Sequence, residues 1–327
     1  MSIFRISVLR NLLAVATLLS ASAVVLAQTY PSRPIRILVG FAPGGTADVV
    51  ARIVANKLPE TLGQQVFIEN KAGAGGTLAH ALAAQSPPDG YTYVMATNST
   101  FAIAPHLYSS LPYEENALVS VALVASSGMA LCVHSTVSAR TVEELIALAK
   151  SKPGELNFAS AGLGATSHLA TELFMSMAGI RMSHIPYRAG SQAVQAVVAG
   201  DVQLAFVDVH VAQTLMAAGH VRVLGVTSPS RHPLMPDVPT VSETGLPGFE
   251  MATTTGLFAP RGAASGILQP MEKEIIAVLQ RPDVANQYRT LSFEVLAKGQ
   301  AALDAHVQSE SAKWGKVIRE RGIKLTP

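Results

Sequence analysis

Short β-branched runs alternate with alanine-rich amphipathic windows along this 327-residue chain, and glycine or proline separates them. Strands and helices that alternate at this spacing are typical of an α/β fold with parallel strands. The first part of the chain is predicted to be a βαβαβ unit. Its predicted elements are strands 35–41, 66–69 and 91–96 and helices 46–62 and 79–83.

The pattern restarts after a long extended stretch over 118–133. Two similar units joined by a crossing segment, with a C-terminal part free to return to the first, predict two lobes and a cleft between them. We expect residues 28–126 and 251–327 in the first lobe and 127–250 in the second. The later predicted elements are strands 156–159, 182–185, 204–207 and 221–227 and helices 141–150, 165–178, 191–199, 209–218, 267–279 and 301–321.

The N-terminus has the pattern of a secretory signal. Arg5 and Arg10 precede an apolar stretch that begins after Asn11, and small side chains precede Gln28. This arrangement predicts a signal peptide over 1–27 that is cleaved on export. An uncleaved anchor helix is the alternative, but the serine- and alanine-rich second half of the stretch disfavours it. The single Cys132 cannot form an internal disulfide.

The charge balance argues against a nucleic-acid partner. The chain has 24 basic and 22 acidic residues. Removal of the predicted signal takes away two arginines and no acid, which leaves 22 of each sign. Proteins that bind phosphate backbones use clustered Lys and Arg, and this sequence has no such cluster. An anionic ligand would therefore be held by local dipoles.

The first candidate binding loop joins a predicted strand to a predicted helix. It reads FAPGGTAD, and its candidate ligand residues are Phe41, Ala42, Gly44, Gly45, Thr46 and Asp48. Glycine lets backbone amides approach a ligand closely, and the free N–H groups of a helix start favour an anion. No lysine follows the glycines, so a nucleotide phosphate is disfavoured. The alternative is a plain tight turn with Thr46 as the helix cap.

The second candidate loop has the same design in the other predicted lobe. Its candidate residues are Ser160, Gly162, Gly164, Thr166 and His168. Two helix starts that face one cleft would match a small molecule with a carboxylate at each end. For His168 the alternative is a buried structural histidine bonded to a neighbouring loop.

Further polar residues follow the ends of other predicted strands. Ser99, Tyr187 and Asp208 could line the cleft, although capping of nearby helices would also explain such positions. No spacing of Ser, His and Asp indicates a catalytic triad, and the scattered histidines lack metal-site spacing. We therefore expect no metal and no cofactor.

Several stretches together resemble one family over essentially the whole mature chain, the Bug-type periplasmic solute-binding proteins of the tripartite tricarboxylate transporter family. The matching stretches are YPSRPIR at 30–36, FAPGGTAD at 41–48, ENK at 69–71 followed by GAGG at 73–76, PDGYT at 88–92, LPY at 111–113, 164–169 and PDVPTV at 236–241.

This resemblance implies a type II periplasmic binding-protein fold that closes like a Venus flytrap on a small carboxylate. It also implies a monomeric, periplasmic protein without enzymatic activity that delivers its ligand to large and small integral-membrane permease subunits. The implied ligand loops contain Phe41, Ala42, Gly45, Thr46, Asp48, Ser99, Ser160, Gly162, Gly164, Thr166, His168 and Asp208. Two other hypotheses remain open at this point: a periplasmic enzyme that uses His168 and Asp208 on an organic acid, and a ligand-presenting protein that signals to a membrane sensor.

The sequence departs from the family pattern at three places. Arg188-Ala189 stands where the family usually has Lys-Gly, and Thr255 replaces a Trp before Gly256. The segment 261–266 lacks the prolines expected there. None of these departures touches the two glycine loops.

Overall fold

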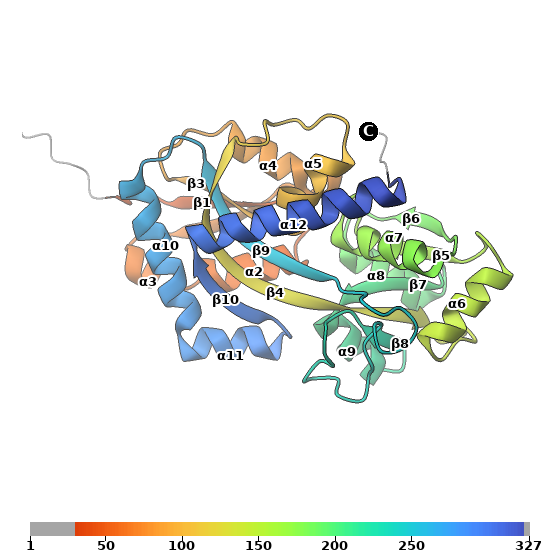
Figure 1. Ribbon diagram of the computed structural model, residues 1–327. Coiled ribbons are helices and arrows are strands. Elements are labelled where there is room, and N and C mark those ends of the chain that lie inside the picture. The colour runs from red at the N-terminus through yellow and green to blue at the C-terminus, as the bar shows by residue number, and fades with distance from the viewer. Residues whose placement is uncertain (1–29, 324–327) are drawn as a thin grey trace, which may run out of the picture. The chain divides into compact units, whose positions relative to one another are not determined.

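The computed structural model describes residues 30–323, and the described residues from Arg33 onward belong to one compact unit. The predicted signal peptide, 1–27, lies outside the described residues. Within them, ten strands form one sheet in the order β2-β1-β3-β9-β4-β7-β5-β6, with β8 and β10 each paired to β4 (Figure 1). The strands are β1 (Ile35–Val39), β2 (Val66–Asn70), β3 (Thr92–Thr97), β4 (Leu118–His134), β5 (Asn157–Ser160), β6 (Ser183–Pro186), β7 (Leu204–Asp208), β8 (Val221–Val226), β9 (Ala252–Pro260) and β10 (Glu294–Gly299).

Helices follow most of these strands and cover the sheet. They are α2 (Thr46–Ala55), α3 (Pro59–Leu62), α4 (Thr77–Ala84), α5 (Ala104–Leu107), α6 (Val142–Ser151), α7 (Thr166–Ala178), α8 (Gly190–Ala199), α9 (Val209–Ala217), α10 (Ser265–Gln280), α11 (Pro282–Thr290) and α12 (Gln300–Arg321). Two short turns, η2 (Ala74–Gly76) and η3 (Ser99–Ile103), precede α4 and α5.

Strand β4 is shared by two regions of the sheet. Its first part pairs with β9 and β10, and its second part pairs with β7 and β8. We call β1, β2, β3, β9, β10 and the first part of β4 sheet region 1. Sheet region 2 consists of β5, β6, β7, β8 and the second part of β4. The long extended segment predicted over 118–133 is thereby confirmed as the strand that connects two α/β units.

The prediction of parallel strands is correct only in part. The pairs β1–β2, β1–β3, β5–β6 and β5–β7 are parallel, as the strand–helix alternation indicated. Strand β9 is antiparallel to both of its neighbours, β3 and β4, and the sequence analysis did not identify it as a strand. It returns from the C-terminal part of the chain, so no local crossover helix marks it.

The helix predicted over 46–62 is wrong in its length. Helix α2 ends at Ala55, and a separate short helix, α3, begins at Pro59. Proline lacks a backbone N–H and crowds the preceding turn, which favours the first position of a new helix over continuation of the old one. The other predicted helices and strands end within two residues of the observed bounds. Helix α11 and strand β10 were not predicted.

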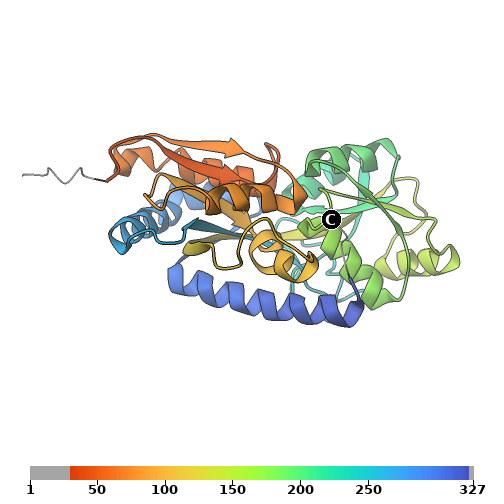
Figure 2. The same ribbon diagram turned by 90° about the horizontal axis from the view of Figure 1, so that it is seen from above.

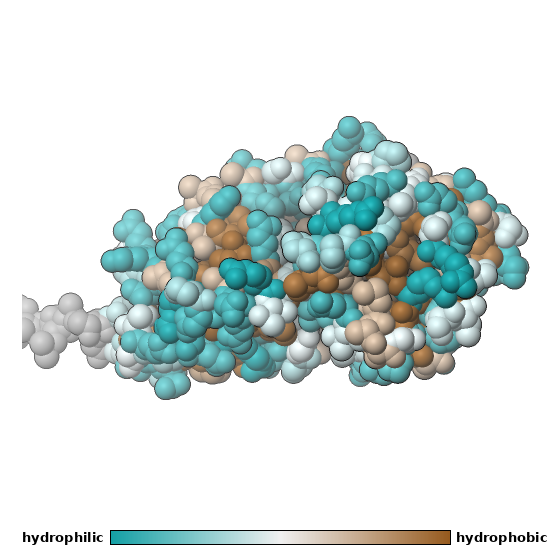
Figure 3. All heavy atoms as spheres, turned by 90° about the horizontal axis from the view of Figure 1, so that it is seen from below, coloured by the Kyte–Doolittle hydropathy of each residue, from teal (hydrophilic) through white to brown (hydrophobic). Residues whose placement is uncertain are grey.

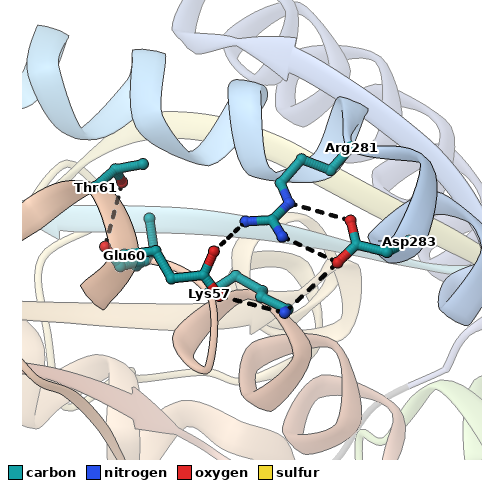
Figure 4. A network of polar contacts seen from close by, with 6 residues as sticks. Lys57, Glu60, Thr61, Arg281 and Asp283 are labelled. Carbon is teal, nitrogen blue, oxygen red and sulfur yellow. Dashed lines mark hydrogen bonds and ion pairs between the residues drawn. The ribbon is translucent and has the colours of Figure 1, made fainter.

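The C-terminal segment packs against the N-terminal one. The phenol group of Tyr288 donates a hydrogen bond to the carbonyl of Val50 in α2 (2.9 Å). At the surface, Arg281 contacts the carboxylates of Glu60 and Asp283, and Lys57 lies 3.5 Å from Asp283 (Figure 4). Helices α2 and α3 therefore pack with α11 in one body.

Helix α12 runs along both sheet regions (Figures 1 and 2). Leu303 in its first turn belongs to an apolar cluster with residues of β1, β3 and β9. Trp314 and Ile318 in its later turns belong to another cluster with residues of β5, α7 and β7. Seen from below, the surface is largely hydrophilic with separate hydrophobic patches (Figure 3). Within the described residues, no helix is long and apolar enough to cross a membrane.

Candidate ligand-binding site

A cavity of about 410 Å³ lies where the strand ends of both sheet regions meet. Its walls come from the loops after β1, β5, β6 and β7, and from the ends of β3 and β9. The helices that follow those four strands, α2, α7, α8 and α9, all begin at this cavity. In each of them the residue before the first turn makes no side-chain cap to the helix amides. Helix starts of this kind carry partial positive charge and unpaired N–H groups.

The loop between β1 and α2 forms the wall from sheet region 1. Its backbone is turned at Gly44, where the positive φ of 84° favours a glycine. Phe41, Ala42, Gly44, Gly45 and Thr46 line the cavity.

Asp48 lies beneath this loop, outside the cavity lining. Its carboxylate accepts hydrogen bonds from the Gly44 amide (2.9 Å), from Arg52 (2.9 Å) and from the Asn70 side chain (2.8 Å). Burial acts to raise the pKa of Asp48, but these hydrogen bonds hold the pKa below its usual range. Asp48 thus orders the loop that lines the cavity.

The loop between β5 and α7 forms a wall from sheet region 2. Thr166 lines the cavity, together with its neighbours Ala165 and Ser167. Ser160 is turned inward, where its hydroxyl hydrogen-bonds Nε2 of His184 (2.6 Å) and the carbonyl of Gly162 (3.1 Å). Burial, together with the neighbouring His168, lowers the pKa of His184 to about 3, so this imidazole stays neutral near pH 7.

His168 is buried behind the same loop. Its Nδ1 accepts a hydrogen bond from the Gly164 amide (3.3 Å), and its ring stacks on His184 with centroids 4.2 Å apart. Its Nε2 lies 3.4 Å from the carboxylate of Glu172. These contacts hold the loop, which is the structural role considered above for this histidine.

Asp208 and His210 carry the titratable side chains of the cavity lining. The Thr46 hydroxyl donates to Oδ2 of Asp208, while Oδ1 is buried and has no partner among the described residues. Nδ1 of His210 is buried and also without a partner within the described residues. Burial raises the pKa of Asp208, although His210 and the Thr46 hydroxyl act in the opposite direction.

The cavity lining, which lies wholly in the described part of the chain, contains no Lys and no Arg. A carboxylate bound here would therefore meet backbone amides, hydroxyl groups and the positive ends of helices, and no Lys or Arg side chain. In residues 30–323, no three His, Cys, Asp or Glu side chains are grouped as a metal ion would need.

The structure brings about half of the predicted site residues to the cavity. Phe41, Ala42, Gly44, Gly45, Thr46, Thr166 and Asp208 line it. The other seven are not part of the lining: Asp48, Ser99, Ser160, Gly162, Gly164, His168 and Tyr187. Among the lining residues that the sequence analysis did not select are Ser167, Gly190, Ser191, His210 and Thr253. Their position in the sequence could have identified four of them, because these four follow a predicted strand and lie in the first turn of the next helix.

The two-region α/β fold with a cavity at its strand ends is the one that solved periplasmic solute-binding receptors have. Solved structures of two-lobed periplasmic binding proteins share this fold, which is of type II. An adipate-bound protein of R. palustris is 31% identical with a TM-score of 0.87, and the match covers 90% of this chain and 100% of the other. The malate-bound MatC of Rhodopseudomonas palustris is 31% identical with a TM-score of 0.84, over 88% of this chain and 100% of the other.

The family follows from the sequence matches. The model described as "Tripartite tricarboxylate transporter family receptor" matches residues 50–323. Protein BugT of Bordetella pertussis (strain Tohama I) is 33% identical over 306 residues, which cover 93% of this chain and 94% of BugT. The chain belongs to the tripartite tricarboxylate transporter receptor family, and it is of the Bug type.

Proposed function

We propose that this receptor captures a small carboxylate in the periplasm and delivers it to the membrane subunits of a tripartite tricarboxylate-type permease. The observation that carries the proposal is the start of four helices at one cavity whose lining has no Lys or Arg. Helix N-termini bind anions without cationic side chains. The adipate and malate bound by the two R. palustris relatives support the same ligand class.

The proposed closure involves two lobes, residues 28–126 with 251–327 and residues 127–250. Strand β9 lies between β3 and β4, and Tyr288 bonds to Val50, so the C-terminal segment is packed with the N-terminal one. A ligand can favour the closed arrangement only through contacts that both lobes make with it. The cavity, with walls from both sheet regions, supports such contacts.

Transport requires that the bound acid leaves chemically unchanged, so the proposal includes no enzymatic step. It also includes export through a cleaved signal peptide over 1–27 and a monomeric receptor without a cofactor. The pattern of Arg5, Arg10 and the apolar stretch before Gln28 supports export.

The proposal is tested by native mass spectrometry of protein purified from the periplasm of expressing cells. The intact mass shows whether the mature chain begins at Gln28. Incubation with mono-, di- and tricarboxylates should yield a one-to-one adduct with an unchanged acid. Conversion of the acid would support an enzyme, and the lack of any adduct across the panel would contradict carboxylate binding. Co-purification with co-expressed permease subunits tests delivery.

A further inference from the structure

The cavity extends farther along two of its four helices than along the other two. Helices α2 and α7 contribute only their first two residues, Thr46–Ala47 and Thr166–Ser167. Helix α8 contributes residues as far as Gln195, and α9 contributes residues as far as Leu215. At a rise of about 1.5 Å per residue, these two positions lie about 7–9 Å beyond the starts of their helices. The cavity therefore continues between α8 and α9, and we call this part the α8–α9 channel.

The two helices flank the channel on one face of sheet region 2. Buried residues of α8 and α9 belong to the same apolar cluster, which places both helices on the same face of the sheet. Both helices also pack on β7, and Val207 of this strand lines the cavity. The channel thus has a wall from each helix and a contribution from the sheet.

The α8–α9 channel is apolar, whereas the helix starts present hydroxyl groups and amides. Its apolar lining residues are Ala193, Val194, Val207, Val211 and Leu215. The polar residues Gln195 and Thr214 also line it, and both are exposed. Binding sites of this kind hold the apolar part of a ligand by hydrophobic contact, while a few polar groups fix its orientation. A cavity with one polar part and one apolar part matches a ligand that is divided in the same way.

We propose that the ligand is a carboxylate with a hydrocarbon body, an aromatic ring or an unbranched alkyl chain, which lies in the α8–α9 channel. The inference rests on the proposed function and narrows its ligand class. The carboxylate meets the helix starts, as in the proposed function. A polyhydroxylated acid would bring hydroxyl groups against valine and leucine side chains that offer no hydrogen bond, which weakens its binding. A further polar group at the far end of the body would reach the exposed Gln195 and Thr214, so a second carboxylate is compatible with the channel.

Calorimetric titration with butanoate, hexanoate, gluconate and benzoate tests the inference. Each buried methylene group tightens binding about three- to fourfold, so hexanoate should bind about tenfold more tightly than butanoate. Gluconate has six carbons and one carboxylate, as hexanoate does, but it carries a hydroxyl group on every other carbon. It should bind at least about tenfold more weakly than hexanoate. Tighter binding of benzoate than of hexanoate would identify the body as an aromatic ring, and the reverse order would identify it as an alkyl chain; either order supports the inference.

Two substitutions test the place of the hydrocarbon body. Val194→Thr and Val211→Thr keep the shape of each side chain and introduce a hydroxyl group from opposite walls of the channel. Each should reduce the advantage of hexanoate over butanoate from about tenfold to below about threefold. Val211 is only half-buried, so its variant should fold even if Val194→Thr does not. Val198→Thr is the matched control in α8, because Val198 lies outside the cavity lining, and it should leave the advantage unchanged.

The possible failures are distinguishable. Gluconate that binds as tightly as both hexanoate and benzoate, or an unchanged hexanoate advantage in the folded channel variants, overturns the inference and leaves carboxylate capture intact. If none of the four acids binds, the inference falls as well. The mass-spectrometric panel then judges the proposed function on its own.

Discussion

Thr46 donates a hydrogen bond from its hydroxyl to the carboxylate of Asp208, although the two residues are 162 positions apart. Thr46 is the first residue of α2, which follows β1 of sheet region 1, and Asp208 is the last residue of β7 in sheet region 2. Because both residues line the cavity, the bond joins the two regions at the site itself. The hydrogen bond from Thr46 also offsets part of the free-energy cost of burying the Asp208 carboxylate.

Thr46→Val should destabilise the protein. Valine has nearly the same shape but no hydroxyl, so the buried carboxylate loses its donor at a cost of about 1–3 kcal/mol. Urea unfolding followed by circular dichroism measures the loss. Thr46→Ser is the matched control, because it keeps the hydroxyl and should stay close to the wild type. Equal stability of the valine and serine variants would show that the bond contributes nothing.

Gly164→Ala should lower the free energy of unfolding more than the same substitution at another glycine with a similar positive φ. Gly164 has a φ of 76°, and a Cβ atom there would lie 2.6 Å from the hydroxyl oxygen of Tyr108. The Tyr108 hydroxyl donates to the carbonyl of Leu163 (3.2 Å), so its displacement also breaks a contact between the end of α5 and the loop before α7.

Gly179→Ala supplies the control for this substitution. Gly179 ends the same helix, α7, with a φ of 63°, and a Cβ atom there would meet nothing within 4 Å. Both variants carry the backbone strain of about 1 kcal/mol. Overpacking against Tyr108 should add about 1–3 kcal/mol for Gly164→Ala alone. Equal unfolding free energies for the two variants would refute a close contact with Tyr108.

The local elements of this fold could be predicted because their signals are local. Glycine at 44 and 164 marks the turns between strand and helix, and apolar periodicity marks the helices themselves. Strand β9 could not be found in this way. Its buried residues Thr253, Thr254 and Thr255 are polar, and the apolar run that follows, 257–259, is too short to mark a strand by itself. Its place depends on pairing with β3 and β4, which lie far away along the chain.

The candidate site could be predicted as far as the position of its loops. Which side chains face the cavity depends on partners that are distant in sequence. Ser160 turns toward His184, which is 24 residues away, and Asp48 turns toward Asn70, which is 22 residues away. The residues within each glycine loop do not indicate which distant side chains these polar groups will bond. Polar residues of a loop can therefore order the loop instead of touching the ligand.

Asp48→Asn should lower both stability and ligand affinity. An asparagine amide cannot accept from the Gly44 amide, Arg52 and Asn70 together, so about 1.5–3 kcal/mol of stability should be lost. The loop that contains Gly44 and Gly45 would lose its order, and calorimetry should show weaker carboxylate binding. Glu60→Gln is the matched control, because it also removes one negative charge, but from a carboxylate in exposed ion pairs. It should lower stability far less and leave carboxylate binding unchanged.

His80 should make the protein less stable as the pH falls. Burial lowers its pKa from 6.5 to about 3, and its Nδ1 has no partner among the described residues. Between these two values the unfolded chain binds a proton at His80 that the folded protein does not bind. The free energy of unfolding therefore decreases as the pH falls from 6.5 toward 3, with a slope of about 1.4 kcal/mol per pH unit from this group. His80→Gln should remove that part of the slope in urea unfolding over this range, whereas His220→Gln, at an exposed histidine, should leave it unchanged. If the unfolding free energy has the same pH slope in the wild type and in His80→Gln, then His80 takes up its proton in the folded protein as well. Its ring, which packs near Tyr113 and Phe258, would then tolerate the positive charge.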